Sequence, residues 1–283
     1  MNVTIADTAG FCFGVKRAVD TVYQAIENAP SPIYTWGPII HNEHVVGDFE
    51  KKGVMVLDED TAELPSEGTV VIRSHGITRE TQERLQASGM QVIDATCPFV
   101  QKIHQIVETQ GKEGRDVIIV GNPSHPEVIG IKGWATGPCY VVSSVEDLKI
   151  CDFSTNNKLC VVAQTTFNYE YFKEIVEIIK NLVYDVSVLN TICNATKERQ
   201  LEARELAAKS DTMLVVGSKS SSNTQKLYSI CKEFCDDTYY IQTLSDLVTV
   251  HFGSDNRVGI TAGASTPNNI IQEVSQYVRR KEF

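Results

Sequence analysis

Three cysteines, Cys12, Cys97 and Cys193, share one local setting. Each follows an apolar run of strand type and precedes a segment with helical periodicity. They recur at intervals of roughly ninety residues, which indicates an internal repeat. Three thiolates could bind zinc with one coordination position left open, or hold an iron–sulfur cluster in which one iron has no protein ligand. The spacing therefore predicts a metal centre and leaves both metals open.

Most of the other five cysteines lie in surroundings typical of a hydrophobic core. Two belong to strand-like runs, and two more lie four residues apart on one helical segment, where no second pair or histidine follows at ligand spacing. In a reducing compartment such cysteines remain thiols, and a buried thiol behaves as a small apolar side chain. We therefore assign no function to Cys139, Cys151, Cys160, Cys231 and Cys235.

Strands and helices have to position the three cysteines, and the sequence predicts both in alternation. Apolar runs such as DVIIV, LCVVA and TMLVV are separated by amphipathic segments such as YEYFKEIVEIIKNL. This alternation is typical of parallel sheets with crossover helices, in which ligands bind at the carboxyl ends of the strands. We predict three small α/β units with mainly parallel sheets, residues 1–96, 97–192 and 193–283, arranged with pseudo-threefold symmetry as a trefoil around the metal centre.

Each predicted unit also offers two polar loops at strand ends. These loops read WGPIIHN, RSHGIT, GNPSHPE, AQTTFN, GSKSSSN and TAGASTP. Hydroxyls, amides and free N–H groups at helix N-termini favour anions, and His41, His75 and His125 can donate hydrogen bonds or carry charge. Helix capping is the commonest role of such serines and would explain either serine loop alone. Their occurrence together with three cysteines favours an anion-binding site.

Glu127 has two interpretations. In the SHPE segment, Ser124 as N-cap and Glu127 three residues later form the pattern of a capping box. Glu127 is also the only carboxylate within the six loops, and its nearest rival is Glu43, two residues after His41. A site that delivers protons beside a metal needs a positioned acid. We therefore favour a catalytic role for Glu127, which is compatible with capping.

Composition limits the partners. The 283 residues carry a formal net charge of −10 and no block of basic residues, which argues against nucleic-acid binding but permits a small phosphorylated ligand. No apolar run has the length of a membrane span, and the first residues lack the basic-then-apolar pattern of a signal peptide. GxGxxG and GxxxxGK[ST] motifs are absent as well. We expect a cytoplasmic protein that binds neither nucleic acid nor membrane.

Six segments together resemble one enzyme family along the whole chain. In order they are GFCFGV, ATCP, GNPSHPE, QTT, SSN and TAGAS, and the combination closely resembles 4-hydroxy-3-methylbut-2-enyl diphosphate reductase, the last enzyme of the methylerythritol phosphate route to isoprenoids. The resemblance implies a trefoil of three α/β units around a [4Fe-4S] cluster held by Cys12, Cys97 and Cys193. It also implies an open iron that takes the allylic hydroxyl group of the substrate, which is then removed as water with two electrons and two protons.

The resemblance further implies roles for the polar loops. Ferredoxin or flavodoxin would deliver the electrons, and Glu127 and Thr165 would relay protons. Thr165 would also contact the substrate. The residues implied to bind the diphosphate are His41, His75, His125, Ser221, Ser222, Asn223 and Ser265.

Two other functions have to be weighed against a reductase. A zinc-dependent hydrolase of a phosphorylated small molecule would also use an open three-cysteine site, but zinc has no redox role. A non-enzymatic iron–sulfur carrier or sensor would explain the cysteines. It would leave the three histidines and two serine loops without a purpose.

Overall fold

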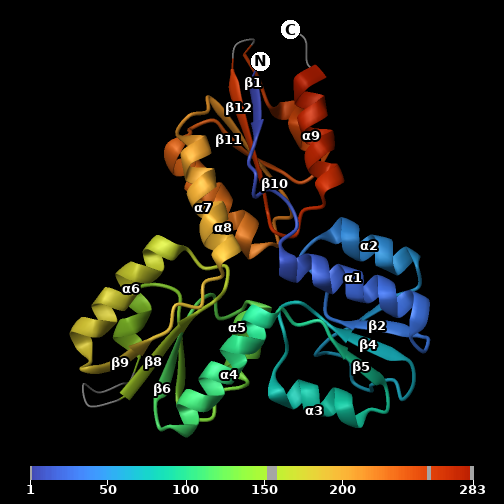
Figure 1. Cartoon of the computed structure of the whole chain (residues 1–283), viewed down its shortest axis with the longest axis vertical. Helices are drawn as coiled ribbons and strands as arrows, with labels where there is room; N and C mark the ends of the chain where they lie inside the picture. The colour runs from blue at the N-terminus through green and yellow to red at the C-terminus, as the bar shows by residue number, and fades with distance from the viewer. Residues whose placement is uncertain (1, 152–157, 254–255, 281–283) are drawn as a thin grey trace. The chain divides into compact units, whose positions relative to one another are not determined.

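The computed structural model describes residues 2–151, 158–253 and 256–280 and is shown in Figure 1. Its strands are β1 (Asn2–Ile5), β2 (Ile33–Trp36), β3 (Met55–Leu57), β4 (Thr69–Ile72), β5 (Gln91–Asp94), β6 (Asp116–Val120), β7 (Cys139–Val142), β8 (Lys158–Ala163), β9 (Asp185–Val188), β10 (Thr212–Val216), β11 (Thr238–Ile241) and β12 (Arg257–Ala262).

Helices lie between most of these strands. The α-helices are α1 (Phe13–Asn28), α2 (Glu43–Lys51), α3 (Arg79–Ala87), α4 (Pro98–Lys112), α5 (Pro126–Lys132), α6 (Tyr169–Leu182), α7 (Asn194–Ala207), α8 (Ser222–Phe234) and α9 (Asn268–Arg280), and two short 3₁₀ helices are η1 (Glu146–Ile150) and η2 (Leu244–Thr249). Among the described residues, no helix is both long and apolar enough to cross a membrane.

The strands form three four-stranded sheets in which every observed pair is parallel. The orders are β3-β2-β4-β5, β7-β6-β8-β9 and β1-β12-β10-β11. Read from its other end, the third order is β11-β10-β12-β1. It then matches the first two orders position by position, with β1 in the fourth place. The predicted class, small α/β units with parallel sheets, is confirmed, and so is an internal repeat at the level of topology.

The first strand differs from the predicted division of the chain. The sequence predicts residues 1–96 as the first α/β unit, but β1 pairs with β12, in the register Asn2 to Arg257, and so completes the third sheet. The boundaries after residues 96 and 192 remain predictions. They fall where the fourth strands of the first and second sheets, β5 and β9, have ended.

The chain divides into two compact units. Compact unit 1 holds the described residues of Met1–Lys16, His41–His44 and Cys193–Phe283, and so contains the β1-β12-β10-β11 sheet. Compact unit 2 holds Arg17–Ile40 and the described residues of Val45–Ile192, with the other two sheets.

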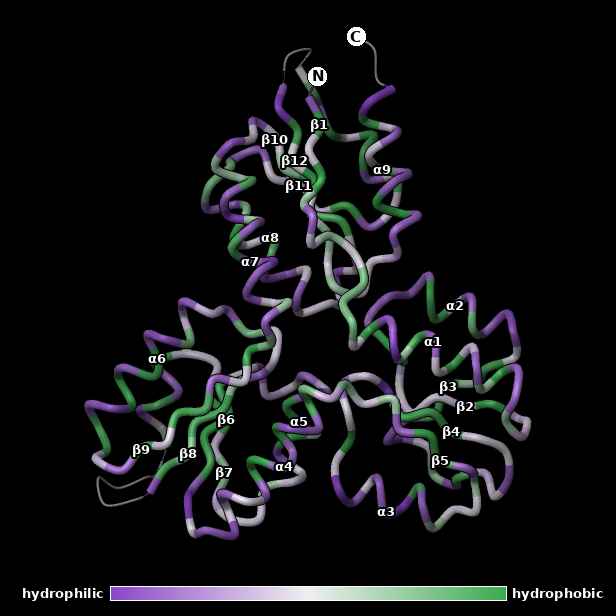
Figure 2. Tube along the Cα trace, viewed as in Figure 1, coloured by the Kyte–Doolittle hydropathy of each residue, from purple (hydrophilic) through white to green (hydrophobic). Residues whose placement is uncertain are grey.

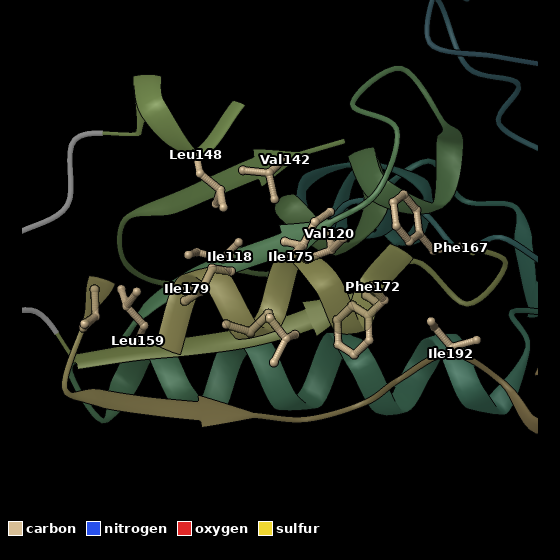
Figure 3. Packing of buried hydrophobic residues seen from close by; sticks show 14 residues of the cluster. Ile118, Val120, Val142, Leu148, Leu159, Phe167, Phe172, Ile175, Ile179 and Ile192 are labelled. Carbon is tan, nitrogen blue, oxygen red and sulfur yellow. The ribbon is translucent and has the colours of Figure 1, made fainter. Parts of the chain in front are cut away.

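Central strands are apolar along their length because helices cover both faces of the sheet. In β6, Ile118 belongs to a core built with α6, whereas Ile119 belongs to a core built with α4 and α5. Figure 3 shows the first of these cores, with Val120 of β6 and Ile175 and Ile179 of α6. In Figure 2, β6 and β8 are accordingly green, whereas hydrophilic and hydrophobic positions alternate along the helices.

The sheet of compact unit 1 is covered in the same way. One face of β10 and β12 packs against α9, and the other face of β10 packs against α7 and α8. Each fully buried aliphatic side chain of this kind contributes about 1.5–3 kcal/mol to folding. The helices are therefore held firmly against the sheets whose strand ends carry the polar loops.

A stack of side chains joins the two sheets of compact unit 2. The ring of His104, on α4, stacks on Trp134 with 5.2 Å between centroids, and the guanidinium of Arg79 lies 4.8 Å from the centroid of the same indole. The indole N–H donates a hydrogen bond of 2.9 Å to the carbonyl of Ile77. Since Trp134 follows α5 and Ile77 lies in the loop after β4, the stack fixes these two loop regions to each other.

Acidification from pH 7 to pH 5 is expected to lower the free energy of unfolding by about 2 kcal/mol through His104. Burial lowers the pKa of His104 to about 4, and the negative charge of Asp94 opposes only part of this shift. Below its ordinary pKa of 6.5 the unfolded chain binds a proton that the folded protein excludes. The contribution of His104 to stability is therefore complete above pH 6.5 and falls as the pH drops towards 4.

Denaturant unfolding of wild-type protein and His104→Gln at both pH values measures this loss. The variant should lose clearly less stability than wild type, whereas His251→Gln, which replaces an exposed histidine, should lose as much. Equal losses in wild type and His104→Gln would show that His104 is not the responsible group.

Candidate functional site

The three predicted ligand cysteines each lie at the start of a helix that follows the fourth strand of a sheet. Cys97 and Cys193 are the N-cap residues of α4 and α7, and Cys12 directly precedes α1. The N–H groups of Val15 and Thr196 donate to the sulfurs of Cys12 and Cys193, at 3.5 and 3.4 Å. Helix N-termini stabilise negative charge, so these positions suit thiolate ligands.

The other five cysteines have surroundings that keep them protonated. Burial raises the pKa of Cys139 and of Cys160 to about 11 and that of Cys231 to about 12. It also raises the pKa of Cys151 and Cys235. Cys231 and Cys235 both belong to the core between β10 and α8, as the sequence predicted. These five thiols are therefore protonated near neutral pH in the metal-free protein.

Glu127 is a buried acid bound to Thr165. The residue is 1% exposed, and its carboxyl group accepts hydrogen bonds from the Thr165 N–H at 2.6 Å and from the Thr165 hydroxyl at 2.7 Å. The predicted capping box is wrong, because His125 and not Ser124 is the N-cap of α5. Ser124 instead donates to the side chain of Asn122. The carboxyl group of Glu127 is thus hydrogen bonded to Thr165 in the loop after β8.

Near neutral pH, Glu127 is present in both its protonated and its ionised form. Burial raises its pKa to about 7, and the two hydrogen bonds from Thr165 offset only part of the effect. A carboxylic acid with this pKa is able to hold a proton and to release it at physiological pH, which is the property of a general acid.

Two of the predicted histidines meet in compact unit 2. The rings of His75, after β4, and His125, after β6, lie edge to face with 5.3 Å between centroids. The Nδ1 atom of His125 accepts a hydrogen bond of 3.2 Å from the N–H of Glu127. In a neutral His125 the hydrogen is therefore on Nε2, which makes that atom a donor. His75, His125, Glu127 and Thr165 are thus brought together by three loops.

The remaining predicted anion binders lie in compact unit 1. Ser221 is the N-cap of α8 and accepts from the N–H of Thr224, so its capping role is real. His41 Nδ1 donates to the carbonyl of Ser220 at 3.0 Å, and the hydroxyl of Ser265 donates to the carbonyl of His41 at 2.9 Å. The loops after β2, β10 and β12 are therefore tied to one another, with Ser222 at the first position of α8.

Asn223 is the clearest sign of a ligand site in compact unit 1. Its side chain is 4% exposed, and neither its Nδ2 nor its Oδ1 has a hydrogen-bond partner among the described residues. Buried polar groups are nearly always hydrogen bonded, and an unpaired one costs about 1–3 kcal/mol. An amide in this position, on the first turn of a helix, suits a polar or anionic ligand.

The sequence did not indicate the contacts of Glu43. Glu43, the rival of Glu127, accepts hydrogen bonds from Ser218 and Ser220 and from the Gln242 amide. Burial raises the pKa of Glu43, but hydrogen bonds from Ser218, from a backbone N–H and from Ser220, together with the charge of His41, outweigh burial, and the net pKa lies below the ordinary value. Glu43 is therefore an ionised structural group that orders the loop before α8.

The chain is similar along nearly its whole length to proteins of one family. The profile of the family described as LytB protein matches residues 3–279. The 4-hydroxy-3-methylbut-2-enyl diphosphate reductase of Caldanaerobacter subterraneus subsp. tengcongensis is 44% identical over 281 residues, covering 99% of this chain and 97% of the relative. The protein of the same name from Aquifex aeolicus is 43% identical over 282 residues, covering 99% and 96%.

Solved structures lead to the same family. A structure described as (E)-4-hydroxy-3-methyl-but-2-enyl diphosphate reductase, the terminal enzyme of the non-mevalonate pathway, is 42% identical, with a TM-score of 0.70 over 98% of this chain and 99% of the other. The E-1-hydroxy-2-methyl-but-2-enyl-4-diphosphate reductase from Plasmodium falciparum is 32% identical, with a TM-score of 0.92 over 100% and 89%. The chain therefore belongs to the LytB protein family.

Proposed function

We propose that this protein reduces (E)-4-hydroxy-3-methylbut-2-enyl diphosphate to isopentenyl diphosphate and dimethylallyl diphosphate. The reaction takes up two electrons and two protons, breaks the bond between the allylic carbon and its hydroxyl oxygen, and releases that oxygen as water. The observation that carries the proposal is the buried Glu127–Thr165 pair, in a chain whose relatives are named for this reductase. Those names favour a reductase over the zinc-dependent hydrolase.

Glu127 is the proton donor in this proposal. Its pKa of about 7 leaves a substantial protonated fraction at neutral pH. The Thr165 hydroxyl, 2.7 Å from the carboxyl, orients the acid and relays its proton. Burial of the pair excludes bulk water, so that the proton is delivered by a fixed group.

The diphosphate is bound by hydrogen-bond donors at strand ends. His125 offers Nε2, Asn223 offers an unpaired amide, and the first turn of α8 offers the positive end of a helix. The residues that we assign to the diphosphate are His41, His75, His125, Ser221, Ser222, Asn223 and Ser265, with Thr165 contacting the substrate as well.

Family membership implies an iron–sulfur cofactor, and we assign its [4Fe-4S] form to Cys12, Cys97 and Cys193. The residues fit such a group, because all three thiols are free of disulfides and two sulfurs face backbone N–H groups, as the sulfurs of cluster ligands commonly do. When bound, the cluster supplies the electrons and an iron that the protein leaves open. Ferredoxin or flavodoxin would be the electron donor, and the cytoplasm the compartment.

Anaerobic purification followed by iron and sulfide analysis tests the cofactor and the reaction together. We expect a brown protein with close to four iron and four sulfide ions per chain, which forms both products from the hydroxylated substrate with a one-electron reductant. A colourless zinc protein that releases phosphate instead would overturn the proposal.

Loss of the Asn223 amide is expected to weaken substrate binding. Asn223→Ala should lower affinity about ten- to a hundredfold, because one hydrogen bond to a charged group is worth roughly 1.5–3 kcal/mol. Iron content should not change, since Asn223 is not a predicted ligand. Titration of the anaerobic protein with substrate measures the affinity.

Asn28→Ala is the matched control for this measurement. Asn28 is exposed, and its amide donates to the Gln24 carbonyl within α1. If both variants bind substrate like wild type, Asn223 is a helix residue without a role in binding.

A further inference from the structure

Helix α7 carries more than a predicted cluster ligand at its N-terminus. The same helix also carries Arg199 and Glu202. They are three positions apart and so lie on one side of the helix. Both reach the loop that leads from β1 to Cys12, within compact unit 1. Neither residue belongs to a motif that the sequence analysis singled out.

Arg199 is buried and bonded to backbone carbonyls. It is 3% exposed, and its guanidinium donates to the carbonyl of Ala262 at 2.7 Å and to the carbonyl of Gly10 at 3.0 Å. Ala262 ends β12, and Gly10 lies two residues before Cys12. A single side chain therefore holds the Cys12 loop to the end of a central strand.

Gly10 is suited to this contact by its backbone. Its φ of +104° is readily adopted only by glycine, and a Cβ here would lie 3.3 Å from Ile271 and 3.6 Å from the Thr266 carbonyl. The Cys12 N–H also donates to the carbonyl of Ala264, at 3.2 Å. The backbone conformation of the loop before Cys12 is therefore fixed by close packing at Gly10 and by the hydrogen bond of the Cys12 N–H.

Glu202 holds the earlier part of the same loop. Its carboxylate accepts from the Asp7 N–H at 2.6 Å and from the Thr8 N–H at 2.9 Å, and it also bonds the Thr8 hydroxyl. Burial raises the pKa of Glu202, but these hydrogen bonds and the charge of Arg199 outweigh burial, and the net pKa is lowered. Glu202 is therefore an ionised acceptor at neutral pH.

The charge of Arg199 lies beside the two loops that carry Cys12 and Cys193. Arg199 is a buried cation on the helix headed by Cys193, and it bonds the carbonyl of Gly10, two residues before Cys12. Burial lowers its pKa, and nearby negative charge opposes that effect. Glu202, whose charge interacts with that of Arg199, forms no salt bridge with it among the described residues. A buried positive charge near a redox centre stabilises the reduced, more negative state and so raises the reduction potential.

We propose that Arg199 and Glu202 are positioning residues that fix the Cys12 loop to the helix headed by Cys193, and that the charge of Arg199 makes the cluster easier to reduce. This inference rests on the proposed iron–sulfur function. It adds two residues that touch neither substrate nor the reacting atoms but set the spacing and the electrostatic potential of two ligands.

Three variants on α7 test the proposal in the anaerobically purified holoenzyme. Arg199→Gln should move the midpoint potential of the cluster to a more negative value, by a tenfold change in the redox equilibrium or about 59 mV for one electron, and should release iron to a chelator faster. Arg199→Lys keeps the positive charge but loses the planar guanidinium group, whose two nitrogens bond the carbonyls of Ala262 and Gly10. It should therefore retain the potential while releasing iron faster. Arg204→Gln, which replaces an exposed arginine packed on Phe234, should match wild type in both measurements.

Hydrogen exchange provides a readout that does not need the cluster. In metal-free protein, the amides of residues 7–12 should exchange faster in Arg199→Gln and in Glu202→Gln than in wild type or Arg204→Gln. If wild type binds no cluster, the proposed function fails, and the exchange result alone decides whether the loop is held as inferred. An Arg199→Gln protein with wild-type potential, iron release and exchange would overturn the inference. Should Arg199→Gln not fold, Arg199→Lys and Glu202→Gln decide the positional part, and wild-type iron release and exchange in both would overturn it.

Discussion

Glu127→Gln is expected to fold, keep its iron and bind substrate, and yet to turn over about a hundred- to ten-thousandfold more slowly. Glutamine has nearly the same shape as glutamic acid, and its amide can maintain both contacts with Thr165, since the carbonyl accepts from the N–H and the NH₂ group donates to the hydroxyl. It has no proton to transfer. A steady-state assay with parallel iron analysis and substrate titration separates loss of chemistry from loss of binding.

The pH dependence gives a second test of the same role. A general acid works only while protonated, so turnover in wild type should fall as the pH rises through about 7, the pKa to which burial raises Glu127. The residual turnover of Glu127→Gln should lack this fall. Thr165→Val, which removes only the relaying hydroxyl, should lose less activity and keep the pH dependence.

A control separates the catalytic role from a structural one. Glu174→Gln changes an exposed glutamate on α6 and should behave as wild type. Near-wild-type turnover in Glu127→Gln would mean that the carboxyl group only anchors Thr165, and that the proton comes from another donor.

Local chemistry could be read from the sequence because it depends on neighbouring residues. The order of strand, cysteine and helix around Cys97 and Cys193 follows from hydrophobic periodicity, and the polar loops follow from the positions where the apolar runs end. Since parallel sheets place such ends at one edge, the meeting of His125, Glu127 and Thr165 after β6 and β8 was predictable.

Long-range pairing was beyond the sequence patterns. Nothing in the run around Val3 indicates that β1 pairs with β12, at the opposite end of the chain, because an apolar strand carries no signal for its partner. For the same reason, the contacts of Arg199 and Glu202 could not be predicted from the sequence. A charged residue in the middle of a helix looks like part of a solvated face until the fold places a backbone carbonyl or N–H beside it.

The error at α5 has a local cause. Ser124 is a favoured N-cap residue, but Pro126 takes the first position of the helix, where its fixed φ and missing N–H are tolerated. The N-cap is therefore the residue before it, His125. This places the imidazole Nδ1 against the Glu127 N–H and leaves Nε2 as the donor that we assign to the substrate.

Replacement of a ligand cysteine is expected to have the largest effect on the protein. Cys12→Ser, Cys97→Ser and Cys193→Ser should each lose most of the iron and nearly all turnover, because a serine hydroxyl stays protonated near neutral pH and is a poor ligand for iron. Cys193→Ser is the most informative variant. Serine is a strong N-cap residue and can accept from Thr196 as the sulfur does, so α7 should form normally.

Cys139→Ser and Cys231→Ser are the matched controls, since burial holds the pKa of these thiols at about 11 and about 12. Cys231 lies in the core of compact unit 1, so a hydroxyl there should lower stability by about 1–3 kcal/mol while leaving iron content and turnover intact. Circular dichroism establishes that each protein is folded, and iron and sulfide analysis gives the result. A folded Cys193→Ser protein with full iron content would remove Cys193 from the ligand set, and with it the equivalence of the three helix starts on which the assignment depends.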